Sequence, residues 1–181
     1  MSNTVQEYDQ VAARCRALFV DKMKDYGPSW RILRPASVTD QLFIKAKRIR
    51  TLEITGESRV GDDVWGEFIA IVNYGIIGII QLELGFSDEI DMTAKDALKL
   101  YDKYLKETKD LMLAKNADYG EAWRGMRVNS FTDLILTKLE RTKEIENHGG
   151  HTLVSEGIAA NYQDMVNYAV FALIKHDNGE A

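Results

Sequence analysis

The hexapeptide "DYGPSW" at residues 25–30 recurs as "DYGEAW" at residues 118–123, 93 residues further along the chain. The agreement continues outward at the same spacing. "YDQ" at 8–10 corresponds to "YDK" at 101–103, and "SVTD" at 37–40 corresponds to "SFTD" at 130–133. After one inserted residue in the second copy, "VNY" at 72–74 corresponds to "VNY" at 166–168. A match of this extent indicates an internal duplication, which determines the architecture.

The duplication divides the chain into two units, which we assign to residues 1–89 and 90–181. Two copies are too few for a solenoid, which needs about three or more stacked repeats. Two related units are expected instead to pack on each other around a twofold axis, as the subunits of a homodimer do. The sequence therefore predicts one compact, intertwined domain with pseudo-twofold symmetry.

Helices account for the pattern within each unit. The chain has two prolines, Pro28 and Pro35, and both fall in one loop, so long helices are permitted elsewhere. The alternation of β-branched and polar residues that is typical of strands is nowhere sustained. We therefore predict an all-α fold in which two three-helix units form one helical bundle, with the apolar third helices at its centre.

Each predicted helix occurs once in each unit. Gly27 and Gly120 are expected to end the first helix, because glycine readily adopts the left-handed conformation found there. Ser37 and Ser130 are expected to cap the second helix. The predicted bounds are 4–24 and 93–117 for the first helix, and 63–84 and 153–175 for the third.

Composition excludes several classes of protein. The net charge of −5 is opposite in sign to that of most nucleic-acid-binding proteins, so direct binding to nucleic acid is not expected. The single cysteine, Cys15, cannot form an intramolecular disulfide, and the N-terminus has no signal-peptide pattern. The most apolar stretch, 68–82, is shorter than a membrane span requires. We expect a cytoplasmic protein with no membrane partner, and the sequence leaves open whether it forms a homo-oligomer.

Basic residues recur on the predicted second helix at positions that folding alone does not explain. Lys45 falls inside the apolar sector of this helix, Lys138 occupies the same position in the second unit, and Arg48 and Arg141 lie one turn further on. A buried ammonium group must reach water or meet an acid. These cations could hold an anionic ligand such as a nucleotide phosphate, or they could form an internal ion-pair network with Glu53 or with acids of the third helix.

The loop that follows each hexapeptide carries further arginines and aromatic residues. Tyr26, Trp30, Tyr119 and Trp123 are predicted either to anchor the loop or to stack on a base. The complete set of predicted phosphate-binding residues is Arg31, Arg34, Lys45, Arg48, Arg124, Arg127, Lys138 and Arg141.

A polar stripe runs along the otherwise apolar third helix. It includes Asn73 and Tyr74 in the first unit and Asn167 and Tyr168 in the second. A polar stripe in an apolar environment needs hydrogen-bonding partners or a polar cavity. We therefore expect the third helices to line the ligand site.

Carboxylates near this stripe are the candidates for catalysis. Glu67, Glu156 and Asp164 could bind Mg²⁺ or act as a general base. Each unit retains one acid of a Glu-x-x-Asp pair, because Glu67 has no acid three residues later and Asp164 has Asn161 three residues earlier. If the units face each other, Glu67 and Asp164 are expected to share a single cavity.

The combined pattern resembles a known family. Lys-x-x-Asp-Tyr-Gly-x-x-Trp-Arg at 22–31 and 115–124 is followed by Asp-x-x-x-x-Lys-x-x-Arg at 40–48 and 133–141, and then by Asn-Tyr in an apolar helix. This arrangement resembles the nucleotide modification associated domain of type 1, an α-helical family of unknown function. The resemblance covers most of the chain and implies an association with nucleotide or nucleic-acid modification systems in bacteria and phages.

A more distant similarity is to the all-α NTP pyrophosphatases, the group of MazG and the dimeric dUTPases. Those proteins are helical, are duplicated or dimeric, and bind magnesium through Glu-x-x-Glu and Glu-x-x-Asp motifs. Here the second helix carries basic residues where that group has Glu-x-x-Glu.

Two classes of function remain open from the sequence. In one, the protein binds nucleotides and acts as a Mg²⁺-dependent nucleoside phosphate hydrolase. In the other, it is a non-catalytic module that binds a ligand or partner, and its repeated charges form a structural network. Three carboxylates within reach of one metal would favour the hydrolase, whereas acids that are each neutralised by Arg or Lys would favour the module.

Overall fold

The computed structural model describes residues 3–56, 63–149 and 157–180. In those ranges the chain is helical, with short connections and no β-strand, which confirms the all-α prediction. The elements are α1 (Thr4–Tyr26), η1 (Ser29–Ile32), α2 (Pro35–Thr55), α3 (Val64–Leu84), α4 (Ala94–Tyr119), η2 (Ala122–Gly125), α5 (Val128–Asn147) and α6 (Ile158–Asp177).

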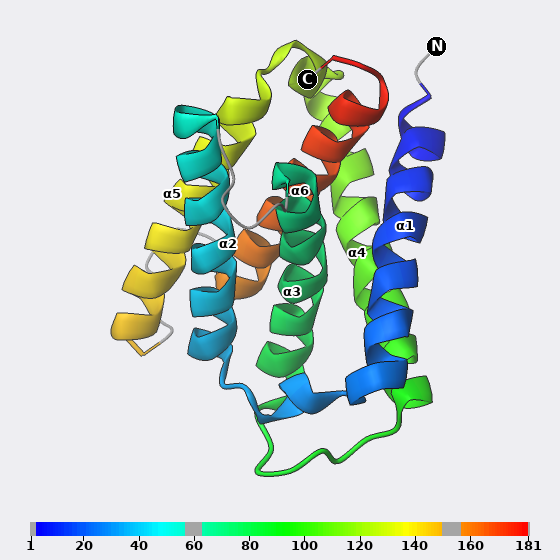
Figure 1. The fold of residues 1–181 in the computed structure, drawn as a ribbon, viewed down its shortest axis with the longest axis vertical. Helices are drawn as coiled ribbons and strands as arrows, with labels where there is room; N and C mark the ends of the chain where they lie inside the picture. The colour runs from blue at the N-terminus through cyan, green and yellow to red at the C-terminus, as the bar shows by residue number, and fades with distance from the viewer. Residues whose placement is uncertain (1–2, 57–62, 150–156, 181) are drawn as a thin grey trace.

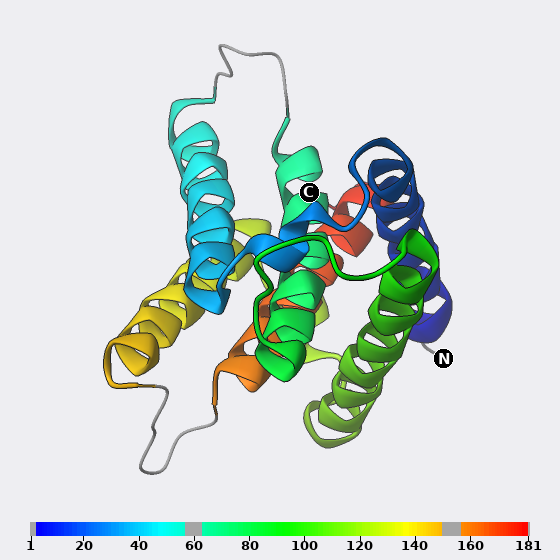
Figure 2. The same ribbon diagram turned by 90° about the horizontal axis from the view of Figure 1, so that it is seen from below.

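The helices are arranged as three pairs, and each pair contains the equivalent helices of the two units (Figure 1). The pair α3–α6 lies at the centre and makes the most extensive helix contact in the molecule. The pair α2–α5 lies on one side of it and the pair α1–α4 on the other, as the view from below also shows (Figure 2). The most apolar helices therefore form the core, as predicted.

Ion pairs between α1 and α4 show that the two units are related by a pseudo-twofold axis. Arg16 pairs with Asp102 at 2.8 Å, and Lys109 pairs with Asp9 at 2.7 Å. Asp9 is equivalent to Asp102 in the repeat, and Arg16 is equivalent to Lys109. The same contact is thus made twice with the units exchanged, as at the interface of a twofold dimer.

The pair α2–α5 repeats this reciprocity with buried hydroxyl groups. Thr39 Oγ1 donates to Glu146 Oε2 and Thr132 Oγ1 donates to Glu53 Oε2, both at 2.9 Å. Each bond joins the beginning of one helix to the end of the other, so the two helices are antiparallel. The repeated threonine and glutamate are therefore explained by the contact between the units.

Hydrogen bonds from tyrosine to asparagine link the units through the core. Tyr8 Oη donates to Asn167 Oδ1 and Tyr101 Oη donates to Asn73 Oδ1, both at 2.7 Å. Each asparagine amide also donates, at 3.1 Å, to a main-chain carbonyl on the first helix of its own unit. The asparagines of the "VNY" repeat are thus structural residues that hold three helices together.

Glycine allows the central helices to approach each other closely. A Cβ atom at Gly75 would lie 2.4 Å from Val166 Cγ2, and one at Gly78 would lie 2.7 Å from Tyr162 Cε2. The Tyr162 ring is held in place because its hydroxyl forms a 2.7 Å hydrogen bond with Thr39. Close contact between α3 and α6 therefore depends on glycine, which has no side chain, at positions 75 and 78.

By length and composition, the 21-residue α3 is able to cross a membrane, so the prediction drawn from residues 68–82 alone considered too short a segment. The helix begins earlier because Asp63 caps it, accepting hydrogen bonds from the main-chain N–H groups of Trp65 and Gly66. Of its most apolar 18-residue segment, 67% is buried within the protein. Packing between α2 and α6 accounts for this composition.

The beginnings of two predicted helices differ from the structure. Ser37 and Ser130 lie inside the first turn of their helices, and the capping positions are occupied by Arg34 and Arg127, which form no side-chain cap. The serine capping prediction is therefore wrong, because the helix continues one turn towards the loop. Helix α6 begins at Ile158, and the predicted start at residue 153 lies outside the described ranges.

We expect Gly78→Ala to destabilise the protein by about 1–3 kcal/mol, the usual range for overpacking a core. Alanine normally stabilises a helix relative to glycine by roughly 1 kcal/mol, and Gly66→Ala should show that effect because its nearest neighbouring atom would be 3.9 Å away. Urea denaturation of both variants measures the difference. A gain in stability for Gly78→Ala would show that α6 moves aside.

Glu53 and Glu146, which accept hydrogen bonds from Thr132 and Thr39, lead to a prediction about the pH dependence of stability. Burial raises the pKa of Glu53 and of Glu146, so the folded state disfavours their charged form. The stability they contribute is present at low pH and is lost as pH rises through the folded-state pKa values. The double variant Glu53→Gln, Glu146→Gln keeps the acceptors for threonine and removes the charge. Its Tm relative to wild type should therefore increase between pH 4 and pH 8, and a constant difference would contradict this account.

Candidate ligand-binding site

Two cavities are related by the duplication. The first, of about 250 Å³, lies between the end of α1, the η1 loop and the middle of α3, and the second, of about 320 Å³, lies between the corresponding parts of α4, η2 and α6. Since α1 and α4 are antiparallel, the cavities lie towards opposite ends of the molecule (Figure 1). Both are lined by the equivalent pairs Lys22 and Lys115, Tyr26 and Tyr119, Trp30 and Trp123, Asn73 and Asn167, and Tyr74 and Tyr168.

The repeated hexapeptide forms one wall of each cavity. Its glycine has a left-handed φ, 63° at Gly27 and 61° at Gly120, which turns the chain out of the helix. Its tryptophan is buried in both units, as a loop anchor requires, and Trp123 stacks on Phe171 with ring centroids 4.3 Å apart. The hexapeptide thus turns the chain at its glycine and fixes the loop at its tryptophan.

The tyrosine of each hexapeptide is exposed, unlike the tryptophan. Tyr26 is 67% exposed and Tyr119 is 74% exposed, although both line a cavity. They are therefore available for a ligand and contribute little to anchoring the loop. Tyr74 and Tyr168, from the third helices, form the opposite wall and are partly buried.

An acid between two lysines distinguishes the second cavity. Asp164, which is 5% exposed, accepts from Lys115 Nζ at 2.7 Å and pairs with Lys138 Nζ at 3.0 Å. Burial and the nearby Asp164 carboxylate together raise the pKa of Tyr168. The predicted pairing of Lys138 with an acid of the third helix is confirmed.

In the first unit, the basic residues of α2 pair with an acid at a different position of the third helix. Glu67 pairs with Arg48 at 3.0 Å and with Lys45 at 3.9 Å, which confirms the predicted pairing of Lys45. Glu67 lies one helical turn before the position equivalent to Asp164, and it lines neither cavity.

The prediction that Glu67 and Asp164 share one cavity is wrong. Helices α3 and α6 are antiparallel, because Trp65 at the beginning of α3 stacks on His176 at the end of α6 with centroids 3.9 Å apart. Residues near the beginnings of the two helices, such as Glu67 and Asp164, are therefore separated along the bundle.

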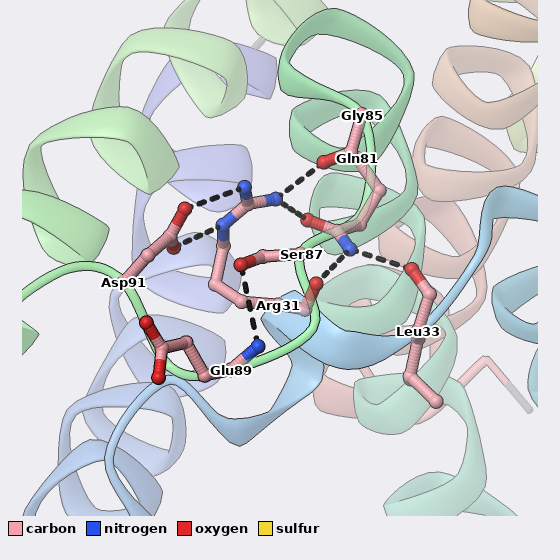
Figure 3. A network of polar contacts seen from close by, with 7 residues as sticks. All are labelled: Arg31, Leu33, Gln81, Gly85, Ser87, Glu89 and Asp91. Carbon is pink, nitrogen blue, oxygen red and sulfur yellow. Dashed lines mark hydrogen bonds and ion pairs between the residues drawn. The ribbon is translucent and has the colours of Figure 1, made fainter.

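Arg31 is held by contacts within the protein rather than directed into a cavity (Figure 3). It is 4% exposed, and its guanidinium donates to both oxygens of Asp91, at 2.9 and 3.2 Å, to Gln81, and to the carbonyl of Gly85 at 2.6 Å. The Gln81 amide donates in return to the main-chain carbonyls of Arg31 and Leu33. This network fastens the loop to the end of α3.

Arg124, the equivalent of Arg31, is also used internally. It donates to Thr4 at 2.9 Å and pairs with Glu7, and its guanidinium lowers the pKa of the Glu7 carboxyl. The Lys175 ammonium donates to the main-chain carbonyl of Arg124 at 2.7 Å, as Gln81 does to Arg31. Because of these internal contacts, neither Arg31 nor Arg124 lines one of the two cavities.

The remaining predicted cations lie outside the walls of the two cavities. Arg34 and Arg127 are exposed at the beginnings of α2 and α5, and the Arg34 guanidinium lies 5.7 Å from the centre of the Phe86 ring. Arg141 pairs with Glu144 at 3.2 Å near the surface.

Comparison with known families identifies the family to which the chain belongs. The family model described as nucleotide modification associated domain 1 matches residues 22–82 and 115–176. The chain belongs to this family. Both matches begin at the cavity lysine of their unit, Lys22 or Lys115, and continue through the loop and the second helix into the third. No curated protein and no solved structure matches the chain.

The two lysines at which the family matches begin are absent from the phosphate-binding residues predicted from the sequence. They stand four residues before the cavity tyrosines, Tyr26 and Tyr119, on the same face of their helix. Their recurrence in the repeat was the available signal. Lys22 is exposed and has no ion-pair partner among the residues that the structure describes.

The carboxylates of this family member do not form a metal site in the described ranges. No three His, Cys, Asp or Glu side chains of residues 3–56, 63–149 and 157–180 come close enough together to hold a metal ion. Glu67 and Asp164 are each paired with two cations, whereas Mg²⁺ requires carboxylate oxygens that are free to bind it. Glu156 lies outside those ranges, so its predicted role stays a prediction.

Replacing Arg31 by alanine should destabilise the protein, because Gln81 and the Gly85 carbonyl lose a buried donor. We expect a loss of roughly 1–3 kcal/mol for each acceptor left without a partner. Arg34→Ala removes the same side chain from an exposed position and should change stability by less than about 0.5 kcal/mol. Chemical denaturation compares the two, and equal effects would contradict the structural role of Arg31.

Proposed function

We propose that this protein binds a nucleotide in at least one of the duplicated cavities, through stacking on tyrosine and an ion pair between lysine and phosphate. The observation that carries the proposal is that a lysine and an exposed tyrosine recur together in both cavities, at Lys22 and Tyr26 and at Lys115 and Tyr119. Lys22 is exposed, whereas Lys115 is half-buried and pairs with Asp164. The family description, nucleotide modification associated domain 1, points to the same class of ligand.

The dimensions and composition of the cavities suit a mononucleotide. The first volume, about 250 Å³, lies just below the range of roughly 300–1,000 Å³ for small-molecule sites, and the second, about 320 Å³, lies at its small end. Stacking of one base on an aromatic ring contributes about 1–3 kcal/mol, and a hydrogen bond between charged groups contributes about 1.5–3 kcal/mol. Together these interactions contribute about 2.5–6 kcal/mol, which corresponds to a dissociation constant between tens of micromolar and tens of millimolar before the entropic cost of association is subtracted.

Binding without catalysis is better supported than hydrolysis. Glu67 and Asp164, the two candidate acids that the structure describes, are each neutralised by two cations, the arrangement that favours a binding module. Such acids are weak candidates for a general base or a metal ligand, since their negative charge is already compensated. We therefore assign the lysines to ligand binding and the acids to their orientation.

Isothermal titration calorimetry with a panel of ribo- and deoxyribonucleoside mono-, di- and triphosphates, with and without Mg²⁺, tests the proposal. The double variant Lys22→Met, Lys115→Met should lower the affinity for the bound nucleotide about 10-fold or more, since each charge-assisted bond contributes at least about 1.5 kcal/mol. Lys24→Met removes the same charge from an exposed position that lines neither cavity, and it should bind as wild type does.

Three results would contradict the proposal. Failure of the wild-type protein to bind any member of the panel would exclude nucleotide binding. An unchanged affinity in the double lysine variant would place the ligand elsewhere. Turnover of a nucleotide in the presence of Mg²⁺, followed by chromatography and abolished in Glu156→Gln, would establish the hydrolase instead.

A further inference from the structure

The two cavities differ in formal charge at one lining position. Ala70 lines the first cavity, and Asp164, its equivalent in the repeat, lines the second. The lysine, both tyrosines, the tryptophan and the asparagine occur in both cavities, and the other differences between the linings, such as Met23 with Asn116 and Ile77 with Phe171, change no formal charge. The first cavity therefore has the lysine and the aromatic residues of the second but lacks its carboxylate.

In the second cavity the carboxylate is held by the lysines. Asp164 lies 2.7 Å from Lys115 Nζ and 3.0 Å from Lys138 Nζ, and it is almost completely buried. These distances are typical of strong charge-assisted hydrogen bonds. Two cations from different helices thus converge on one anionic group.

In the first cavity the equivalent lysines have no such anion between them. Lys22, equivalent to Lys115, has no ion-pair partner in the described part of the chain. Lys45, equivalent to Lys138, lies 3.9 Å from Glu67, which is too far for a hydrogen bond, and Arg48 already donates to Glu67 at 3.0 Å. The positive charge on this side of the first cavity is therefore incompletely compensated.

We infer that the Asp164 carboxylate occupies, in the second cavity, the place that the phosphate group of the ligand occupies in the first. The inference rests on the proposed function and identifies which cavity performs it. The nucleotide phosphate lies above Ala70 between Lys22 and Lys45, and the base stacks towards Tyr26. The second cavity contains its own anion and does not bind the nucleotide.

Electrostatics supports this division between the cavities. A phosphate monoester carries a charge of about −1.5 to −2 near neutral pH. In the second cavity it would come close to the buried Asp164 carboxylate, and like charges at short distance in a partly desolvated site repel strongly. In the first cavity the same phosphate meets the methyl group of Ala70 and the Lys22 ammonium in the wall, with Lys45 at the position whose equivalent, Lys138, contacts Asp164 in the second unit.

Reciprocal substitutions at this position test the inference with 2′-deoxyadenosine 5′-monophosphate as the probe in titration calorimetry. Wild type should bind one equivalent. Ala70→Asp should reduce affinity at least 10-fold while retaining the wild-type Tm, because Lys22 and Lys45 pair with the new carboxylate. Asp164→Ala should open the second cavity and raise the stoichiometry from one to two.

Further variants distinguish the loss of a charge in the cavity from a failure of the protein to fold. Lys22→Met should abolish binding in wild type, whereas Lys24→Met, which lies outside both cavities, should leave it unchanged. If Ala70→Asp fails to fold, the gain of a second site in Asp164→Ala still decides the matter. Two equivalents bound by wild type or a single equivalent bound by Asp164→Ala would overturn this inference and leave the proposed function intact. No binding of any nucleotide by wild type would instead overturn the proposed function.

Discussion

The structure depends on two hydrogen bonds that cross its core, from Tyr8 to Asn167 and from Tyr101 to Asn73. Each joins the first helix of one unit to the third helix of the other, so neither unit completes its core alone. A buried asparagine must satisfy both its amide and its carbonyl, and here it does so only when three helices are in place. Assembly of the two units and formation of the core are therefore the same event.

The same two asparagines position the cavities. Asn73 and Asn167 line them, and the next residue in each unit, Tyr74 or Tyr168, forms the wall opposite the hexapeptide loop. The loop is fixed independently, because Gln81 and Lys175, at equivalent positions of the third helices, donate to the main chain of the loop arginine. Each cavity thus lies between rigid elements, which favours a preorganised ligand site.

The repeat allowed much of this to be predicted: the all-α class, the central third helices and the pairing of Lys45 and Lys138 with acids. It did not predict the direction in which the third helices pack, and the assignment of Glu67 and Asp164 to one cavity failed for that reason. Arg31 shows a second limit, since its partner Asp91 lies in the connection between the units, which occurs once. An internal repeat identifies equivalent residues, but contacts with a unique segment cannot be deduced from it.

The contacts between the units have the geometry of a symmetric dimer, yet both units belong to one chain. In a homodimer every substitution is made twice, so a carboxylate introduced into one binding site appears in both. A fused chain is free of this restriction, so Ala70 and Asp164 can occupy equivalent positions in two cavities that share their lysine, tyrosines, tryptophan and asparagine. Covalent linkage therefore gives each site an independent evolutionary history, in which one can specialise while the other preserves the scaffold.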